Sequence, residues 1–152
     1  MNRRSFNESL VSSLPLPAGE REALLALARA EGALFPKTLV SRGLLSADAL
    51  RRAYESTLGI SAFRREAAEE RSVPQELLPL PFMRARMLIP VALENGTLVV
   101  AMADPLDADA LEAVAKATGQ RVVVLAGTEE EIREAIEKVY GEGSYSVERL
   151  VE

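Results

Sequence analysis

The segment Met87-Leu-Ile-Pro-Val-Ala-Leu-Glu-Asn-Gly-Thr-Leu-Val-Val-Ala-Met-Ala103 predicts a β-hairpin. Its two apolar runs of strand length, Met87–Leu93 and Thr97–Ala103, are separated by Glu94-Asn95-Gly96. Asn-Gly between apolar runs is the strongest local signal for a hairpin turn. Pro90 lacks the N–H group that a ladder hydrogen bond requires, so we expect the first strand at an edge of the sheet.

The chain after this hairpin continues as helix, strand and helix. Asp104-Pro105 begins a helix, and residues 121–125 form an almost wholly apolar strand. A right-handed crossover would place that strand parallel to the second strand of the hairpin. Thr128 and Glu131 have the spacing of a capping box at the start of a last helix, which Gly141 ends. The order predicts a lobe with a small mixed sheet.

The first half of the chain has helical periodicity. Apolar residues recur at helical spacing in residues 20–31, 36–42 and 46–58, and a glycine follows each segment closely. The predicted fold class is therefore α+β, with an N-terminal helical lobe before a small mixed β-sheet lobe. The predicted organisation is an amphipathic arm with a proline hinge (1–17), a helical lobe (18–72), an α/β lobe (73–141) and a linker towards a downstream region (142–152).

The composition excludes several kinds of function. The chain of 152 residues has no His and no Cys, which removes the commonest general base and every thiolate site. A net charge of −5 argues against nucleic-acid binding, and no apolar run is long enough to span a bilayer. Asp104, Asp107 and Asp109 lack the spacing of a calcium loop and are expected to serve a helix start. We expect no catalytic residue, no cofactor and no metal.

Two groups of residues are candidates for contact with a partner protein. Phe6, Leu10 and Leu14 form an apolar stripe on a short helix before the proline hinge. This stripe either packs on its own lobe, which is the usual fate of such a face, or enters a groove on a partner. Arg51 and Arg52 either meet an acidic partner surface or belong to an ordinary ion-paired, solvated helix face.

The residues also resemble those of a known family. The similar segments cover roughly residues 33–141, and the run Val100-Ala-Met-Ala-Asp-Pro105 is the most specific of them. The segments are Leu39–Leu50, Leu58–Ile60, Val73-Pro74 with Leu77, Leu88–Val91, Asn95–Asp107 and Gly127–Gly141. They resemble the N-terminal domain of the ATPases that drive type II secretion and type IV pilus assembly.

The resemblance implies an adaptor rather than an enzyme. In that family the domain precedes a hexameric ATPase core and docks the motor onto the cytoplasmic part of an inner-membrane platform protein. The implied partners are that platform protein and an ATPase domain in the same chain, with no nucleic acid and no direct membrane insertion. The implied location is cytoplasmic, peripheral to the inner membrane through the protein partner. The sequence does not separate secretion from pilus assembly.

Two alternatives stay open. Some relatives bind cyclic di-GMP through Arg-Leu-Gly motifs, so the chain could be a sensor of that dinucleotide. Leu34-Phe35-Pro36 stands at the matching position and lacks both the guanidinium and the glycine of the motif. The other alternative is a stand-alone adaptor, which a phosphate-binding loop encoded beyond Glu152 would exclude.

Overall fold

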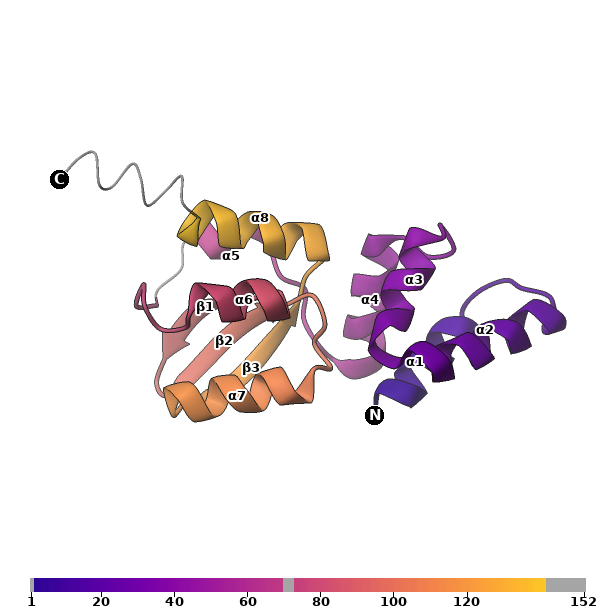
Figure 1. The fold of residues 1–152 in the computed structure, drawn as a ribbon, viewed down its shortest axis with the longest axis horizontal. Helices are drawn as coiled ribbons and strands as arrows, with labels where there is room; N and C mark the ends of the chain where they lie inside the picture. Colours follow the sequence, from indigo (N-terminus) through magenta and orange to yellow (C-terminus); the bar gives the residue numbers. More distant parts are fainter. Residues whose placement is uncertain (1, 70–72, 142–152) are drawn as a thin grey trace. The chain divides into compact units, whose positions relative to one another are not determined.

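The chain folds into two compact units (Figure 1). The computed structural model describes residues 2–69 and 73–141. Internal contacts divide the chain into a helical unit, Met1–Gly59, and an α/β unit, Ile60–Glu152. The combination of helices with a mixed sheet confirms the predicted α+β class.

The helical unit consists of helices and one short 3-10 turn. These elements are α1 (Arg3–Ser12), α2 (Ala18–Glu31), η1 (Gly32–Leu34), α3 (Phe35–Ser41) and α4 (Ala47–Leu58). Side-chain oxygens cap two of the helices, since Asn2 accepts from the Ser5 N–H at 2.9 Å and Ser46 accepts from the Ala49 N–H at 3.0 Å. The helices expected in residues 20–58 are confirmed, and the arm before the prolines forms α1.

The helical unit repeats one pattern of buried side chains. α1 and α3 carry fully buried phenylalanines, Phe6 and Phe35, and a buried leucine one turn later, Leu10 and Leu39. A longer helix follows each of them, α2 after α1 and α4 after α3. The sequence alone does not reveal this repetition, because few residues outside the buried positions are shared.

The α/β unit is built on a three-stranded sheet in the order β1-β2-β3. Its elements are α5 (Arg65–Glu69), α6 (Leu80–Arg86), β1 (Leu88–Glu94), β2 (Thr97–Met102), α7 (Ala108–Thr118), β3 (Arg121–Ala126) and α8 (Glu129–Tyr140). β1 pairs antiparallel with β2, and β2 pairs parallel with β3, as the hairpin and the crossover predict. The hairpin turn at Asn95 and Gly96 has positive φ at both residues. Pro90 lies in an edge strand, as expected, and the pairing of β1 shifts between Pro90 and Ala92.

Helices cover both faces of this sheet. Figure 1 shows α7 on one side and α6 with α8 on the other. The buried residues that join these elements are Leu88, Ile89, Leu98, Val100, Met102, Ala110, Val114, Ile132 and Ile136. A three-stranded sheet needs such cover to be stable, so the apolar content of the strands accounts for the helices around them.

Helices α5 and α6 precede the hairpin and are not among the elements expected from the sequence. Pro79 is the N-cap of α6 and Pro81 lies in its first turn, where a missing N–H removes no helical hydrogen bond. The prolines therefore start a helix. Arg84 then holds α6 on α8, because its Nε and an NH2 group donate to the two carboxylate oxygens of Glu137 at 2.8 and 2.9 Å.

The segment that follows α4 belongs to the sheet. The Phe63 N–H donates to the Ala126 carbonyl at 2.8 Å, and the Ala126 N–H donates to the Ser61 carbonyl at 2.9 Å. These bonds add a short parallel bridge to the end of β3, and Phe63 is buried in the core. The α/β unit therefore starts at Ile60. The boundary predicted at residue 72 and the linker predicted for residues 142–152 lie outside the described residues.

A glycine substitution tests this packing. A Cβ atom at Gly127 would lie 2.8 Å from the Ile132 Cδ1 and 3.2 Å from the Phe63 Cδ2. We expect Gly127→Ala to lower the free energy of unfolding by about 1–3 kcal/mol in urea titrations, because the core must move to admit the methyl group. Gly19→Ala is the control: nothing lies within 4 Å of its Cβ, and alanine favours the helix by up to about 1 kcal/mol. Equal stability of the Gly127 variant and the parent would contradict the packing.

The Arg84–Glu137 pair predicts a specific pH dependence. The hydrogen bond from Arg84 lowers the pKa of Glu137 from its ordinary value of 4.5. The pair therefore stabilises the fold fully above that value, and its contribution is lost as the pH falls through the lower pKa of the folded state. We expect Glu137→Gln to cost at most about 1 kcal/mol at pH 7, since both side chains are about half exposed.

The difference between Glu137→Gln and the parent should shrink as thermal melts are repeated at pH values from 4.5 downwards. Glu130→Gln serves as the control, because Glu130 is exposed on the same helix and forms no ion pair in the described part of the chain. A stability loss in Glu137→Gln that stays constant with pH would exclude the ion pair as its cause.

Candidate functional site

The predicted partner-binding stripe lies inside the helical unit. Phe6, Leu10 and Leu14 have exposed fractions of 0, 2 and 7%. The Phe6 ring stacks on the Tyr54 ring of α4 at a centroid distance of 4.5 Å, which ties the arm to its own unit. The arm thus packs on its own lobe, and contact of these three side chains with a partner, which would require α1 to leave this packing, stays a prediction.

The two predicted arginines lie on α4. An NH2 group of Arg51 donates to the Asp48 carboxylate at 2.5 Å, one turn earlier on the helix. Arg52 is exposed. The Asp48 pair is what an ordinary solvated helix face would show, and a role of Arg51 and Arg52 in partner binding also stays a prediction.

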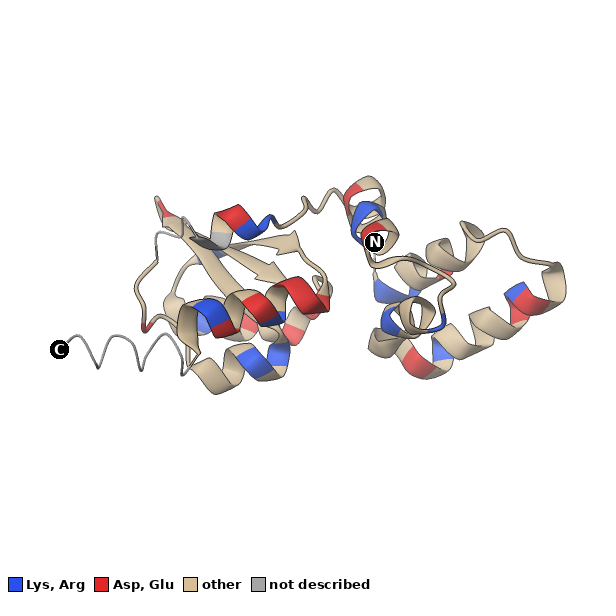
Figure 2. Cartoon of the chain, turned by 90° about the horizontal axis from the view of Figure 1, so that it is seen from above, with Lys and Arg blue, Asp and Glu red and all other residues tan. Residues whose placement is uncertain are grey.

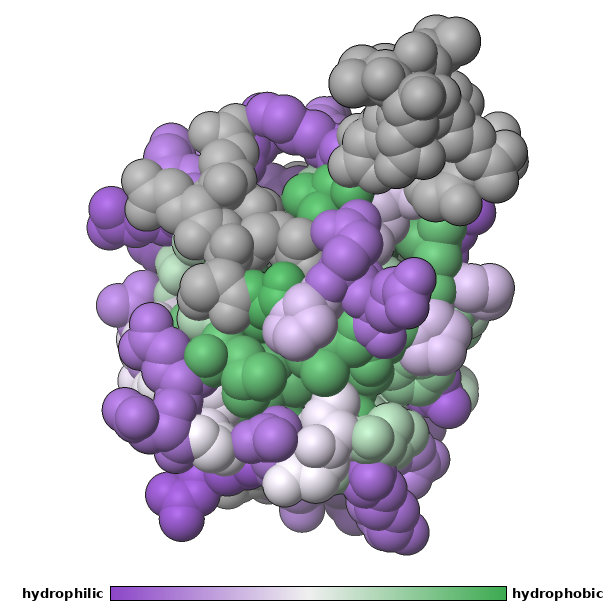
Figure 3. Space-filling model, turned by 90° about the vertical axis from the view of Figure 1, so that its left-hand side faces the viewer, coloured by the Kyte–Doolittle hydropathy of each residue, from purple (hydrophilic) through white to green (hydrophobic). Residues whose placement is uncertain are grey.

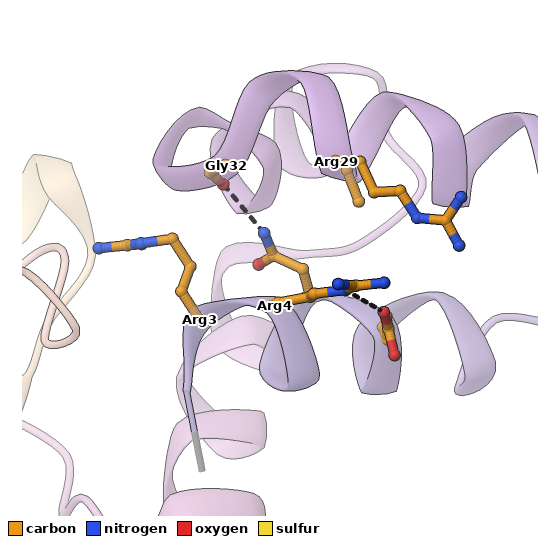
Figure 4. Close-up of a pocket in the computed structure, with 7 residues that line it drawn as sticks. Arg3, Arg4, Arg29 and Gly32 are labelled. Carbon is orange, nitrogen blue, oxygen red and sulfur yellow. Dashed lines mark hydrogen bonds and ion pairs between the residues drawn. The ribbon is translucent and has the colours of Figure 1, made fainter.

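A cavity of about 470 Å³ lies between α1 and the end of α2 (Figure 4). Its lining consists of Arg3, Arg4, Asn7, Glu8, Ala28, Arg29 and Gly32. The Arg4 Nε donates to Glu8 at 3.1 Å, while Arg29 forms no ion pair within the described residues. Three guanidinium groups and one carboxylate thus surround this cavity, which gives it a positive lining.

A buried polar side chain forms part of this lining. Asn7 is 2% exposed, and its Nδ2 donates to the Gly32 carbonyl at 2.9 Å. Its Oδ1 is buried and accepts no hydrogen bond in the structure. Gly32 has a φ of +56°, which favours glycine at this position. The cavity therefore combines cations with an unused acceptor, a set of groups that suits an anion carrying a hydrogen-bond donor.

Sequence reasoning missed this cavity, although one signal for it exists. Asn7 follows Phe6 and precedes Leu10 by one turn, so a polar residue lies on the apolar stripe of α1. A polar side chain on a buried face needs a hydrogen-bond partner, and the Asn7 Nδ2 finds one in the carbonyl of Gly32, 25 residues later in the sequence. The cavity could not be assembled without the fold.

The segment at the position of the Arg-Leu-Gly motif, Leu34-Phe35-Pro36, is apolar. Leu34 ends η1 and is 62% exposed, while Phe35 and Pro36 are buried at the start of α3. An exposed leucine supplies no charge or hydrogen bond to a phosphate. Leu34 therefore offers an anion neither charge nor a hydrogen bond, whereas the arginines of α1 and α2 line a cavity.

The acidic residues of the α/β unit serve its helices. The Asp107 side chain accepts from the Ala110 N–H at 3.1 Å and caps α7, and an NH1 group of Arg86 also contacts it at 3.1 Å. Asp104 accepts from the Leu106 N–H at 3.3 Å. Within residues 2–69 and 73–141, no three acidic side chains come together as a metal site would require.

The outer surface of the α/β unit is mixed. The helices drawn in Figure 2 carry acidic and basic segments side by side. Figure 3 shows one end of this unit, where apolar side chains form a continuous area among polar ones. Half-buried apolar residues that pack against the core of this unit include Leu77, Leu80 and Val139. The Gln75 Nε2 donates to the Val139 carbonyl at 3.3 Å. This area suits a protein contact.

Among the helices that the structure describes, none is long and apolar enough to cross a lipid bilayer.

Comparison with known proteins gives a consistent set of relatives. Residues 58–145 match the MshEN domain. The chain is 34% identical to type II secretion system protein E of Xanthomonas campestris over 93 residues, which are 57% of this chain and 16% of that protein. It is 26% identical to the type IV pilus assembly ATPase PilB of Myxococcus xanthus over 144 residues, which are 95% of this chain and 25% of that protein. The chain thus spans a quarter or less of the length of these curated relatives.

Solved structures share the fold. The N-terminal domain of XpsE superposes with a TM-score of 0.72 at 25% identity, covering 93% of this chain and 98% of that one. The structure of MshE with cdg superposes with a TM-score of 0.70 at 22% identity, covering 89% of this chain and 98% of that one. The second likeness shows the fold alone. Because these structures cover both units, the arrangement of a helical unit followed by an α/β unit is shared with them.

Proposed function

Because the chain belongs to the MshEN domain family, which forms an N-terminal domain of secretion and pilus-assembly ATPases, we propose that it docks such an ATPase onto a membrane platform. Its partner would be the cytoplasmic domain of an inner-membrane platform protein. The motor that hydrolyses ATP would lie outside these residues, in the same polypeptide. The chain would then be cytoplasmic and reach the membrane only through its protein partner.

The observation that carries this proposal is the place of the family match. Residues 58–145 nearly coincide with the α/β unit, which begins at Ile60. The helical unit lies almost wholly outside the match, and its Leu34-Phe35-Pro36 segment lacks the Arg-Leu-Gly motif. The family character of this chain is therefore strongest in the unit that has an apolar area on its surface and, among its described residues, no cluster of acidic side chains that could hold a metal. This supports recognition of a protein rather than chemistry.

A rigid surface suits this role. The α/β unit is held rigid in two ways: helices pack on β2, and Arg84 pairs with Glu137. A partner would therefore bind a preformed surface, and little conformational entropy would be lost on binding. The half-buried side chains Leu77, Leu80 and Val139 would supply apolar contact area on this unit.

Docking can be measured directly. We expect calorimetry of this chain with the purified cytoplasmic domain of its platform protein to give a dissociation constant in the micromolar range. Leu80→Asp should weaken binding about tenfold or more, because it places a charge in apolar contact area. Leu44→Asp is the control, since it places the same charge on an exposed leucine of the helical unit, and thermal melts of both variants check that half-buried Leu80 tolerates the change. Absence of binding by the parent chain would contradict docking.

A second candidate function follows from the cavity in the helical unit. A cyclic dinucleotide such as the cdg of the MshE structure carries phosphates and base N–H groups. Arg3, Arg4 and Arg29 would meet the phosphates, and the buried Oδ1 of Asn7 would accept from a base N–H. On this view the chain senses the dinucleotide, and the arginines of α1 and α2 take over what Leu34 cannot provide.

Titration with cyclic di-GMP tests the second function. If the cavity binds the dinucleotide, Arg29→Glu should reduce the affinity for cyclic di-GMP about tenfold or more, because it replaces a cation with a carboxylate that repels the phosphates. Arg42→Glu is a matched control in the same unit, because Arg42 is exposed and does not line the cavity. No heat at millimolar dinucleotide, or equal loss in both variants, would exclude the cavity as a dinucleotide site.

A further inference from the structure

The two edges of the sheet differ in their protection. β1 carries Pro90, which offers no N–H, and its pairing shifts between Pro90 and Ala92. Proline and irregular pairing are the usual devices that stop a second strand from joining an edge. β3 forms the other edge with the sequence Arg121-Val-Val-Val-Leu-Ala126, which has no proline and pairs with β2 in an unbroken register.

The backbone of β3 presents unused hydrogen-bonding groups. The N–H groups of Arg121 and Gly127 bond inward, to Gly96 and Met102 of the β1–β2 side. The N–H and C=O of Ala126 point the other way and bond to the Ser61–Phe63 bridge. Alternation along a strand therefore directs the N–H and C=O groups of Val122 and Val124 outward. No hydrogen bond joins those groups to another part of the described chain.

The side chains along this edge are apolar and accessible. Val123 is 45% exposed, although it lies in the middle of a strand of three valines. Val122 and Val124 are half-buried. An exposed, regular and apolar edge strand attracts another strand, so its persistence in a folded protein indicates that one is meant to bind there.

Charges mark both ends of the edge. Arg121 begins β3, and Arg64 lies two residues after the bridge residue Ala62, which pairs with the last residue of β3. Neither guanidinium forms an ion pair within the described residues. Of the three glutamates in the first turn of α8, Glu129 and Glu131 are held within their own helix by Arg133 and by the capping box, whereas Glu130 is exposed and forms no ion pair within the described residues. An incoming segment with carboxylates at its ends would therefore find a cation at each.

We propose that the β3 edge of the α/β unit binds an extended, apolar segment of a partner protein, flanked by acidic residues, as an added strand. The segment pairs with the outward N–H and C=O groups of Val122 and Val124, its apolar side chains contact Val123 and its neighbours, and its carboxylates meet Arg121 and Arg64. The Ser61–Phe63 bridge limits the added strand to the part of β3 before Ala126. This inference shares with the proposed function only the premise that the chain binds another protein.

Amide hydrogen exchange gives a backbone-specific test. The probe is a synthetic peptide of alternating valine and threonine with two glutamates at each end. In the free chain the Val122 and Val124 amides should exchange faster than those of Val123 and Leu125, which bond to β2. Saturating peptide should slow exchange at Val122 and Val124 about tenfold or more and leave Val123 unchanged. The proposal would be overturned if the Val122 and Val124 amides were already protected before peptide is added. It would also be overturned if their protection rose with protein concentration, because the edge would then bind a second copy of the chain.

Charge reversal supplies a second test that leaves the backbone intact. Arg64→Glu and Arg121→Glu together should weaken the glutamate-ended peptide about tenfold and favour the same peptide with lysines at its ends. Arg42→Glu, in the helical unit, should change neither affinity. Binding without discrimination between the two peptides would refute the acidic character of the partner.

The same measurements separate this proposal from docking itself. If the platform domain binds but leaves the Val122 and Val124 amides unprotected, the edge is not its site and docking stands. If the peptide protects those amides and the platform domain does not bind, the edge site stands and the docking partner is wrong.

Discussion

Burial of the central strand is the constraint on which the α/β unit depends. Leu98, Val100 and Met102 share one face of β2 and are fully buried, and Ala101 is fully buried on the opposite face, so helices have to cover the sheet on both faces. The parallel pairing of β3 with β2 then requires a crossover, which α7 provides, and α8 returns across the other face. The bidentate contact between Arg84 and Glu137 and the bridge from Ser61–Phe63 add to an arrangement that the strands already impose.

The sequence carried most of the fold and little of the candidate site. The hairpin, the capping box at Thr128 and the edge position of Pro90 follow from local rules, because turn geometry and missing donors act over a few residues. Helix α6 was hidden by prolines whose meaning depends on where a helix starts. The cavity was hidden because Asn7 and Gly32 meet only after α1 packs on α2, and no local pattern records that contact.

The two units of this chain differ in how closely they resemble the family. The family match falls on the α/β unit, whereas the helical unit keeps its repeated buried phenylalanines, Phe6 and Phe35, without the Arg-Leu-Gly motif. Core positions are fixed by packing, and surface positions are free to change when a ligand is exchanged or lost. The arginines that line the cavity beside Asn7 lie on α1 and α2.

The contrast between the two sheet edges limits how far assembly through the sheet can go. Growth of a fibre by strand addition needs an accepting edge on each side of every copy, so that one molecule leads to the next. Pro90 and the shifted pairing beside it close one side of this sheet, so strand addition at the other side ends after a single event. A molecule of this kind can be kept at high local concentration, as around a multi-subunit machine, without polymerising through its sheets.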